Sequence, residues 1–227
     1  MQLTPFDVIK ARAEARKGKE GLADIIARRL ARPAAEPTDA QLLSSMAFHI
    51  FAAGISHKVV ENKWPGTEEA FLDFDPNLLN IQPDDFWHDL LSDTRIIRHG
   101  AKVNAIRHNA AFVSELTKEH GSAVRYLLDW PATDQIGLLD FMTKRGDRLG
   151  GYTGQYALRA IGKDNFVLSQ DVVACLKDAG AITGDGSTKA ERRAIQEAFN
   201  TWAVQSGLPM SQISLTCAMS IGAEYAE

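Results

Sequence analysis

A glycine-rich turn and a carboxylate downstream of it are the residues of this chain whose types could do chemistry. The turn is Arg148–Tyr156 (RLGGYTGQY), and Asp171 follows after one more helical pattern. Glycines allow a tight bend and the close approach of another backbone. The unpaired N–H groups that open the following helix attract a phosphate. The turn is therefore either a grip for a nucleic-acid backbone or an ordinary corner between two helices.

Asp171 stands where a helix is expected to begin. It follows the polar pair Ser169-Gln170 and precedes the apolar Val172 and Val173. A carboxylate in the first helical turn is favoured by the helix macrodipole, so Asp171 could serve only as a cap. Alternatively it is an acid beside an extruded nucleotide.

The composition is that of a globular domain with a sizeable core. Of the 227 residues, 45% are hydrophobic and 24% charged, which suits a soluble helical body. The net charge of -4 means that any nucleic-acid contact needs a local positive face. Cys175 and Cys217 lie far apart in the sequence, which argues against a disulfide scaffold and a zinc cluster. No run is apolar and long enough for a membrane span and no signal peptide is visible, so we expect the cytoplasm.

Basic residues gather in two stretches, one before the middle of the chain and one around the turn. Acidic residues cluster elsewhere, between Glu61 and Asp89. Charge runs are often only solvated faces, but this separation favours a positive surface for DNA. The basic residues are Arg95, Arg98, His99, Lys102, Arg107, Lys144, Arg145, Arg148 and Arg159.

Helical periodicity of apolar residues runs through almost the whole chain, which predicts an all-α fold. We expect an N-terminal helical appendage over residues 1–36 and one domain over 37–227. Trp64-Pro65-Gly66 is expected to form a turn. A long helix is predicted from about Ala101 to Gly121, and two more on either side of the glycine-rich turn. Phe166–Leu168 is too short to support a sheet.

The turn, the helix after it and the run ending in Gln170-Asp171-Val172 resemble the helix-hairpin-helix DNA glycosylases. The resemblance implies a helical bundle in which the hairpin grips the DNA strand and Asp171 assists cleavage of the N-glycosidic bond. It also suggests a monovalent cation held by the hairpin carbonyls.

Two further segments are similar to the 3-methyladenine DNA glycosylase I family. They are Ala53–Ser56 (AGIS) and Ile96–Ile106 (IIRHGAKVNAI), and the likeness extends over about Thr38 to Leu176. It continues with Lys144, Arg145, Gly146, Gly151, Thr153 and Tyr156 at matching spacing.

The sequence departs from that family in ways that affect its chemistry. The family holds a zinc through cysteines and histidines near both chain ends, and this sequence lacks all of them, so no zinc and no other cofactor are expected. The family's pocket glutamate is replaced by His49, and the tryptophan after the motif's serine by His57. In contrast, that family lacks the superfamily's aspartate, which this chain has in Asp171.

These resemblances imply a set of site residues. The catalytic acid would be Asp171. The position of the lysine that forms a Schiff base in bifunctional members is Gln155, which cannot act as that nucleophile. Each proposed pocket residue could instead be a core or solvent residue. The predicted base pocket comprises His49, Phe51, His57, Tyr152 and Tyr156, and the predicted DNA contacts are Arg98, Lys102, Arg148, Gly150, Gly151, Thr153, Gly154 and Gln155.

The sequence thus predicts a monofunctional DNA glycosylase that removes a flipped, damaged, alkylated purine from double-stranded DNA, acting as a monomer. Two alternatives remain open. One is an inactive protein of the same fold that binds nucleic acid or lesions. The other is an all-helical interaction protein with a fortuitous glycine-rich turn.

Overall fold

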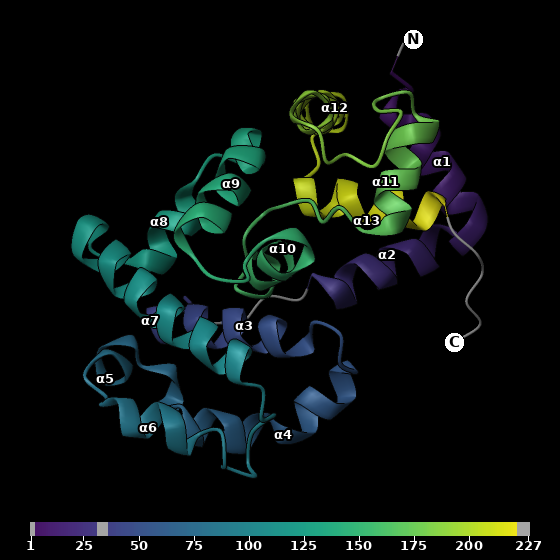
Figure 1. Cartoon of the computed structure of the whole chain (residues 1–227). Helices are drawn as coiled ribbons and strands as arrows, with labels where there is room; N and C mark the ends of the chain where they lie inside the picture. The colour runs from purple at the N-terminus through teal and green to yellow at the C-terminus, as the bar shows by residue number, and fades with distance from the viewer. Residues whose placement is uncertain (1–2, 31–35, 222–227) are drawn as a thin grey trace. The chain divides into compact units, whose positions relative to one another are not determined.

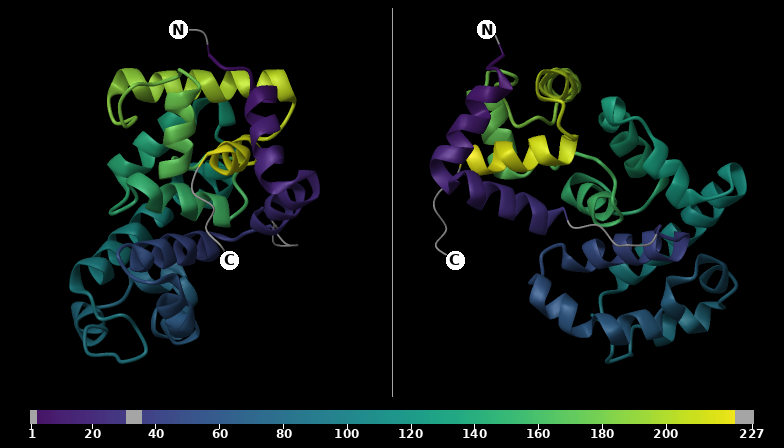
Figure 2. Two further views of the ribbon diagram at one scale, coloured as in Figure 1. Left: turned by 90° about the vertical axis from the view of Figure 1, so that its right-hand side faces the viewer. Right: turned by 180° about the vertical axis from the view of Figure 1, so that it is seen from behind.

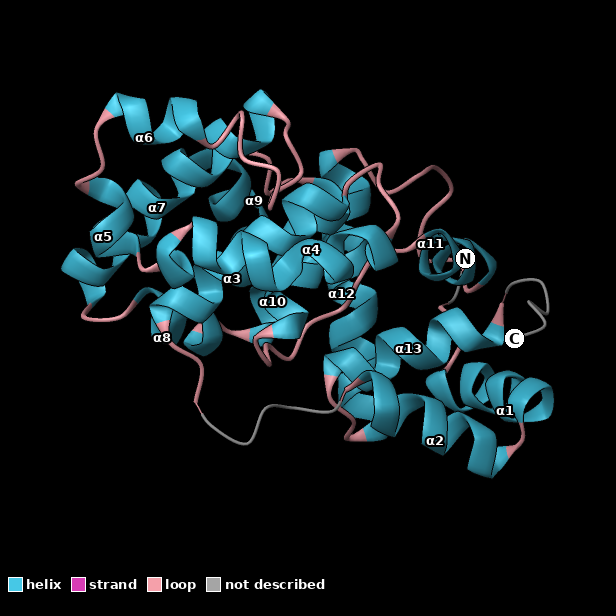
Figure 3. Cartoon of the chain, turned by 90° about the horizontal axis from the view of Figure 1, so that it is seen from below, coloured by secondary structure: helices cyan, strands magenta, loops and turns pink. Residues whose placement is uncertain are grey.

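The computed structural model describes residues 3–30 and 36–221. Within that part, thirteen α-helices and two short 3-10 helices are joined by loops, and no strand is formed (Figures 1 and 3). The predicted all-α class is confirmed. None of the described helices has both the length and the apolar character that crossing a bilayer requires.

The chain divides into two compact units, each built from segments distant in sequence. Unit 1 comprises Met1–Arg32, Pro131–Gly137 and Asp164–Glu227; unit 2 comprises Pro33–Trp130 and Leu138–Lys163. The N-terminal helices therefore share a unit with the C-terminal ones. The sequence-based division at residue 36 stays a prediction.

In unit 1, the helices pack around α13 (Met210–Ser220), which lies against α1, α2, α11 and α12 (Figure 2). Nearly every α13 side chain is buried. Phe166, Phe199 and Trp202 form the aromatic part of the core, and Phe6 joins them from α1. The other helices of this unit are α1 (Phe6–Lys17), α2 (Lys19–Arg29), η2 (Ala132–Asp134), α11 (Gln170–Asp178) and α12 (Lys189–Ser206).

The two cysteines meet in this core. Cys175 of α11 and Cys217 of α13 are both buried and reduced. The Cys217 thiol donates a hydrogen bond that lowers the pKa of Cys175, and Ser220 Oγ lies 3.5 Å from Cys175 Sγ. The pair fills a core position, and its proximity could not be read from the separation of the two residues in the sequence.

In unit 2, α3 (Asp39–Ala52) is the central element and packs against α4, α7 and α10. Its start is fixed by a side-chain cap, because Thr38 and Gln41 form a reciprocal capping box. The other helices are α4 (His57–Ala70), η1 (Leu72–Phe74), α5 (Pro76–Asn80), α6 (Asp84–Asp89), α7 (Gly100–His120), α8 (Ala123–Asp129) and α10 (Gly151–Ala160); α9 (Gln135–Arg145) joins this unit from Leu138 onward.

The turn predicted at Trp64-Pro65-Gly66 is wrong, because α4 continues through it. A proline inside a helix costs about 3 kcal/mol, so tertiary contacts must offset it. Thr67 Oγ1 donates to the Lys63 carbonyl at 2.9 Å, and the Trp64 ring stacks on Phe74 with centroids 5.4 Å apart. Packing of this kind is invisible to a local turn signal.

Candidate DNA-binding hairpin and base pocket

The glycine-rich turn forms a helical hairpin whose glycines are required by close contacts. It joins the end of α9 to α10, and the buried Leu149 lies at its centre. A Cβ on Gly154 would lie 2.3 Å from the Leu149 carbonyl oxygen, and a Cβ on Gly146 would lie 2.4 Å from Leu149 Cδ1. Gly151 has a φ of +58°, which glycine adopts without strain.

The hairpin loop is fastened to α7 by Asn109. Its Nδ2 donates to the Asp147 carbonyl at 2.9 Å, and its Oδ1 accepts from the Asp147 N–H at 2.8 Å. Asn109 is 0% exposed, so water cannot take over these bonds. The sequence analysis did not single out Asn109, and only its place in an otherwise apolar helix face could have drawn attention to it.

The start of α10 is arranged to receive an anion. Gly150 occupies the cap position and supplies no side-chain acceptor for the first N–H groups. Arg148 and Tyr152 on either side are exposed, and Thr153 is half-buried. Unlike these residues, Gly154 and Gln155 are buried, and Gln155 Nε2 donates to the Gly151 carbonyl at 2.9 Å. A helix start with free N–H groups beside an arginine suits a phosphate.

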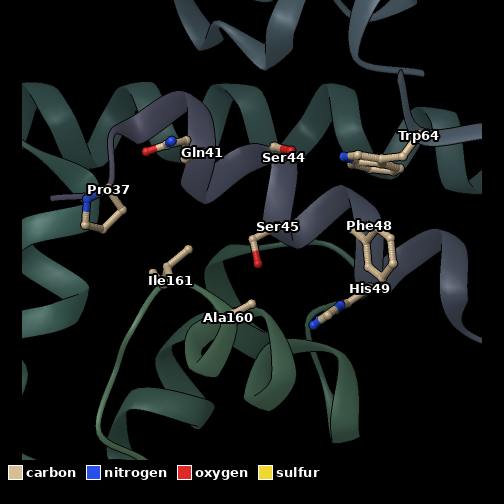
Figure 4. Close-up of a pocket in the computed structure, with 9 residues that line it drawn as sticks. All are labelled: Pro37, Gln41, Ser44, Ser45, Phe48, His49, Trp64, Ala160 and Ile161. Carbon is tan, nitrogen blue, oxygen red and sulfur yellow. The ribbon is translucent and has the colours of Figure 1, made fainter. Parts of the chain in front are cut away.

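A pocket of about 340 Å³ opens between α3, α4 and α10 (Figure 4). Its size is within the range of small-ligand sites. Ser45 Oγ donates to the Ala157 carbonyl at 2.9 Å and thereby ties α3 to α10 beside the pocket. The lining carries no carboxylate, lysine or arginine; it consists of Pro37, Gln41, Ser44, Ser45, Phe48, His49, Trp64, Ala160 and Ile161.

His49 is the polar group of this pocket that lacks a partner. Neither ring nitrogen reaches solvent or has a hydrogen-bond partner within the described chain. Burial, and then the charge of His57, lower the pKa of His49 to about 4. The imidazole is therefore neutral at pH 7, with one nitrogen a donor and the other an acceptor. A buried polar side chain without a partner calls for an explanation, and a ligand is one.

Three of the predicted pocket residues lie together. The rings of His57 and Tyr156 lie with centroids 6.3 and 5.9 Å from that of His49. Phe51 does not join them: its side chain is in the core, against Phe71. Tyr152 is 49% exposed on the first turn of α10. Phe51 is therefore a core residue of α3 and does not line the pocket.

Most of the residues that line the pocket were not predicted from the sequence. Gln41, Ser45 and Phe48 line it from one face of α3, because residues three and four apart stand one above another on a helix. Trp64 was not predicted to line the pocket, because it was assigned to a turn and not to a helix. The spacing on α3 was the available signal, but it also fits a core-facing stripe.

A profile of the methyladenine glycosylase family matches residues 32–138. The segment contains α3, α4 and α7, and therefore His49, His57 and Asn109.

Solved structures show the same fold over more of the chain. The 3-methyladenine DNA glycosylase I of Staphylococcus aureus matches with a TM-score of 0.51 at 21% identity, over 66% of this chain and 89% of that one. The 8-oxoguanine glycosylase/lyase of Methanocaldococcus jannaschii, solved with DNA containing 8-oxoguanine, matches with a TM-score of 0.56 at 14% identity, over 92% of this chain and 95% of that one. These likenesses confirm the predicted helix-hairpin-helix glycosylase fold.

Asp171 lies in the first turn of α11, and its side chain is half-buried. The cap of α11 is a different residue, since Ser169 Oγ accepts from the Val172 N–H at 3.3 Å. Asp171 is therefore not required as the cap. It belongs to unit 1, whereas the hairpin and the pocket belong to unit 2.

Two lysines bind main-chain carbonyls near helix ends. Lys102, predicted to contact DNA, is 5% exposed, and its Nζ donates to the carbonyls of Phe51 and Ala53 at 3.0 and 2.7 Å. Burial, and then the charge of Arg148, lower the pKa of Lys102. Lys163 Nζ donates to the Leu128 carbonyl at 2.7 Å, next to the end of α8. The ammonium of Lys102 is thus committed to the end of α3.

The positive face is smaller than the sequence suggested. Three of the arginines considered for it form ion pairs with carboxylates, whereas Arg98 and Arg148 are exposed. The pairs join Arg95 to Glu69 and Asp93, Arg107 to Asp84, and Arg145 to Glu115 and Glu119. Within the described ranges, no group of three histidine, cysteine or acidic side chains is placed to hold a metal ion.

Proposed function

We propose that this protein is a monofunctional glycosylase that hydrolyses the bond between deoxyribose and a flipped, alkylated purine in double-stranded DNA. The observation that carries the proposal is the pocket beside the hairpin. One helix, α10, begins at the hairpin and lines the pocket with its end, at Ala160. The pocket offers apolar walls and a neutral imidazole without a partner, which suits an extruded base.

The proposed reaction adds one water across the glycosidic bond. The C1′–N bond breaks, and its electron pair leaves with the base. The water oxygen bonds to C1′, one of its protons is released to Asp171 and then to solvent, and an uncharged base takes up a proton as it departs. The Asp171 carboxylate would orient the water and stabilise the positive charge that develops on the sugar.

The proposal excludes strand cleavage by a Schiff base. That chemistry needs a free amine near C1′. The family position for it carries Gln155, whose amide is used within the hairpin. Lys163, the nearest lysine along the chain, donates to a main-chain carbonyl. The expected product is an intact strand with an abasic site.

The proposed DNA grip uses the N–H groups at the start of α10 and the exposed Arg98 and Arg148. A monovalent cation between the hairpin carbonyls and a phosphate would add to it. Binding of this kind weakens as salt rises, because it releases counterions from the DNA. Lys102 is left out of the grip, since its donors are bound to α3.

The test is base release by the wild-type chain and by Asp171→Asn. Duplexes carrying single alkylated purines are incubated with each protein, and abasic sites are revealed by alkali. We expect release by the wild type, a loss of at least a hundredfold in Asp171→Asn, and no strand break before alkali. Equal rates in the two proteins would eliminate Asp171 as the acid. Tight lesion binding without any release would establish instead the inactive lesion-binding alternative, which the replacement of the family's glutamate by His49 favours.

A further inference from the structure

We infer that the pocket selects uncharged modified purines over cationic ones, because the side chain of His49, like the rest of the lining, carries no negative charge. The inference rests on the proposed function and adds the charge class of its substrate. N-alkylation of a purine ring nitrogen, as in 7-methylguanine, leaves a positive charge on the base. Adducts that close a ring on the exocyclic nitrogen, as in ethenoadenine, leave the base neutral.

The pocket has nothing to balance a positive charge. None of its nine lining residues is acidic. A cation that leaves water for an apolar site loses its hydration, and only an opposite charge or strong acceptors restore that energy. The acceptors that the lining presents are uncharged: the side-chain oxygens of Gln41, Ser44 and Ser45 and one ring nitrogen of His49. A cationic base would therefore be buried at a cost.

The lowered pKa of His49 also indicates that the pocket disfavours positive charge. Its own positive form is disfavoured, with the pKa at about 4, because of burial and then the charge of His57. A cationic ring placed beside it meets the same low polarity and the same repulsion. An uncharged purine is not repelled and loses less hydration energy when it is buried. The surroundings that keep His49 neutral thus also disfavour a positively charged ligand.

The hydrogen-bonding capacity of His49 matches an uncharged base. A neutral imidazole presents one donor and one acceptor, and its donor can bond to a ring nitrogen of an uncharged purine such as ethenoadenine. The nitrogens are sealed in the free chain, but the rings of His57 and Tyr156 beside them belong to exposed residues that can turn aside. The indole of Trp64 and the ring of Phe48 supply faces for stacking.

The experiment compares two otherwise identical duplexes, one with ethenoadenine and one with 7-methylguanine. Release rates are expressed relative to spontaneous loss, because cationic bases depart more readily without an enzyme. We expect the wild type to prefer ethenoadenine, His49→Gln to keep the preference, and His49→Glu to shift it at least tenfold toward 7-methylguanine. Val59→Glu is the control: it places the same negative charge on an exposed site of α4, outside the pocket, and should leave the ratio unchanged.

Binding separates failure of this inference from failure of the proposed function. Affinity for the same duplexes is measured with Asp171→Asn, alone and combined with His49→Glu. If no protein releases a base but binding follows the predicted order, the function is wrong and the selectivity stands. Preferential release of 7-methylguanine by the wild type, or a ratio that His49→Glu leaves unchanged, would overturn the inference while the glycosylase activity stands.

Discussion

Asn109 binds the main chain of Asp147 in both directions, donating to its carbonyl and accepting from its N–H. One buried amide on α7 thus fixes the loop that precedes α10. This contact joins the hairpin loop to α7, and the Ser45–Ala157 hydrogen bond joins α10 to α3.

Replacing Asn109 with alanine should loosen the hairpin. Two buried main-chain groups would lose their partner, at a cost of about 1–3 kcal/mol each. We expect a lower urea midpoint and weaker DNA binding. His108→Ala is the matched control, since His108 contacts the Asp147 carboxylate only at the surface, where such pairs contribute about 1 kcal/mol or less. Equal losses in both variants would mean that the amide does not fasten the loop.

Gly154→Ala tests the close packing of the hairpin. The added Cβ would lie 2.3 Å from the Leu149 carbonyl oxygen. This contact is too short, so α10 would have to move away from the loop that contains Leu149. We expect destabilisation of about 1–3 kcal/mol and loss of DNA affinity. Gly21→Ala is the contrasting change: it is also within a helix but meets nothing within 4 Å, so it should stabilise by about 0.5–1 kcal/mol. The readouts are thermal midpoints and duplex binding.

Lys102 and Arg148 should differ in how they affect salt dependence. Arg148→Ala should reduce the slope of log affinity for duplex DNA against log salt by about 1. Lys102→Met should lower the urea midpoint, because the carbonyls of Phe51 and Ala53 lose their donor, and leave the slope unchanged. A slope reduced by Lys102→Met at full stability would restore Lys102 to the DNA interface.

His49 should make stability depend on pH between about 6.5 and 4. Its pKa is about 4 in the folded chain and 6.5 when exposed. Between these two pH values, the histidine is therefore mostly protonated in the unfolded chain and mostly neutral in the folded chain. The free energy of unfolding therefore falls as pH drops through this window, by about 2 kcal/mol between pH 7 and pH 5. Urea titrations of wild type and His49→Gln measure it: the variant should show a flatter pH profile. Identical profiles would rule out a depressed pKa.

The sequence predicted what depends on local pattern. Helical periodicity gave the class, and the glycines of the hairpin gave its place, because tight backbone contacts exclude other residues there. The family motifs indicated His49 and His57, which lie together near the pocket. These features are encoded by residues close in the chain.

The remainder depended on long-range contacts. Lys102 was predicted to contact DNA because lysines are usually exposed. Its ammonium is instead buried, where it donates to the carbonyls at the end of α3. Pro65 reads as a turn, yet packing of Trp64 on Phe74 keeps α4 continuous. Cys175 and Cys217 meet through the packing of α11 against α13. In each case a partner far along the chain decides the outcome.

The helix α10 measures about 15 Å from Gly151 to Ala160 at 1.5 Å per residue. In the proposed complex, this helix would set the distance between a phosphate bound at its start and a base bound near its end. Inserting one residue would rotate the far end by about 100° relative to the start. The length of α10 would then determine which nucleotide, counted from the bound phosphate, reaches the pocket.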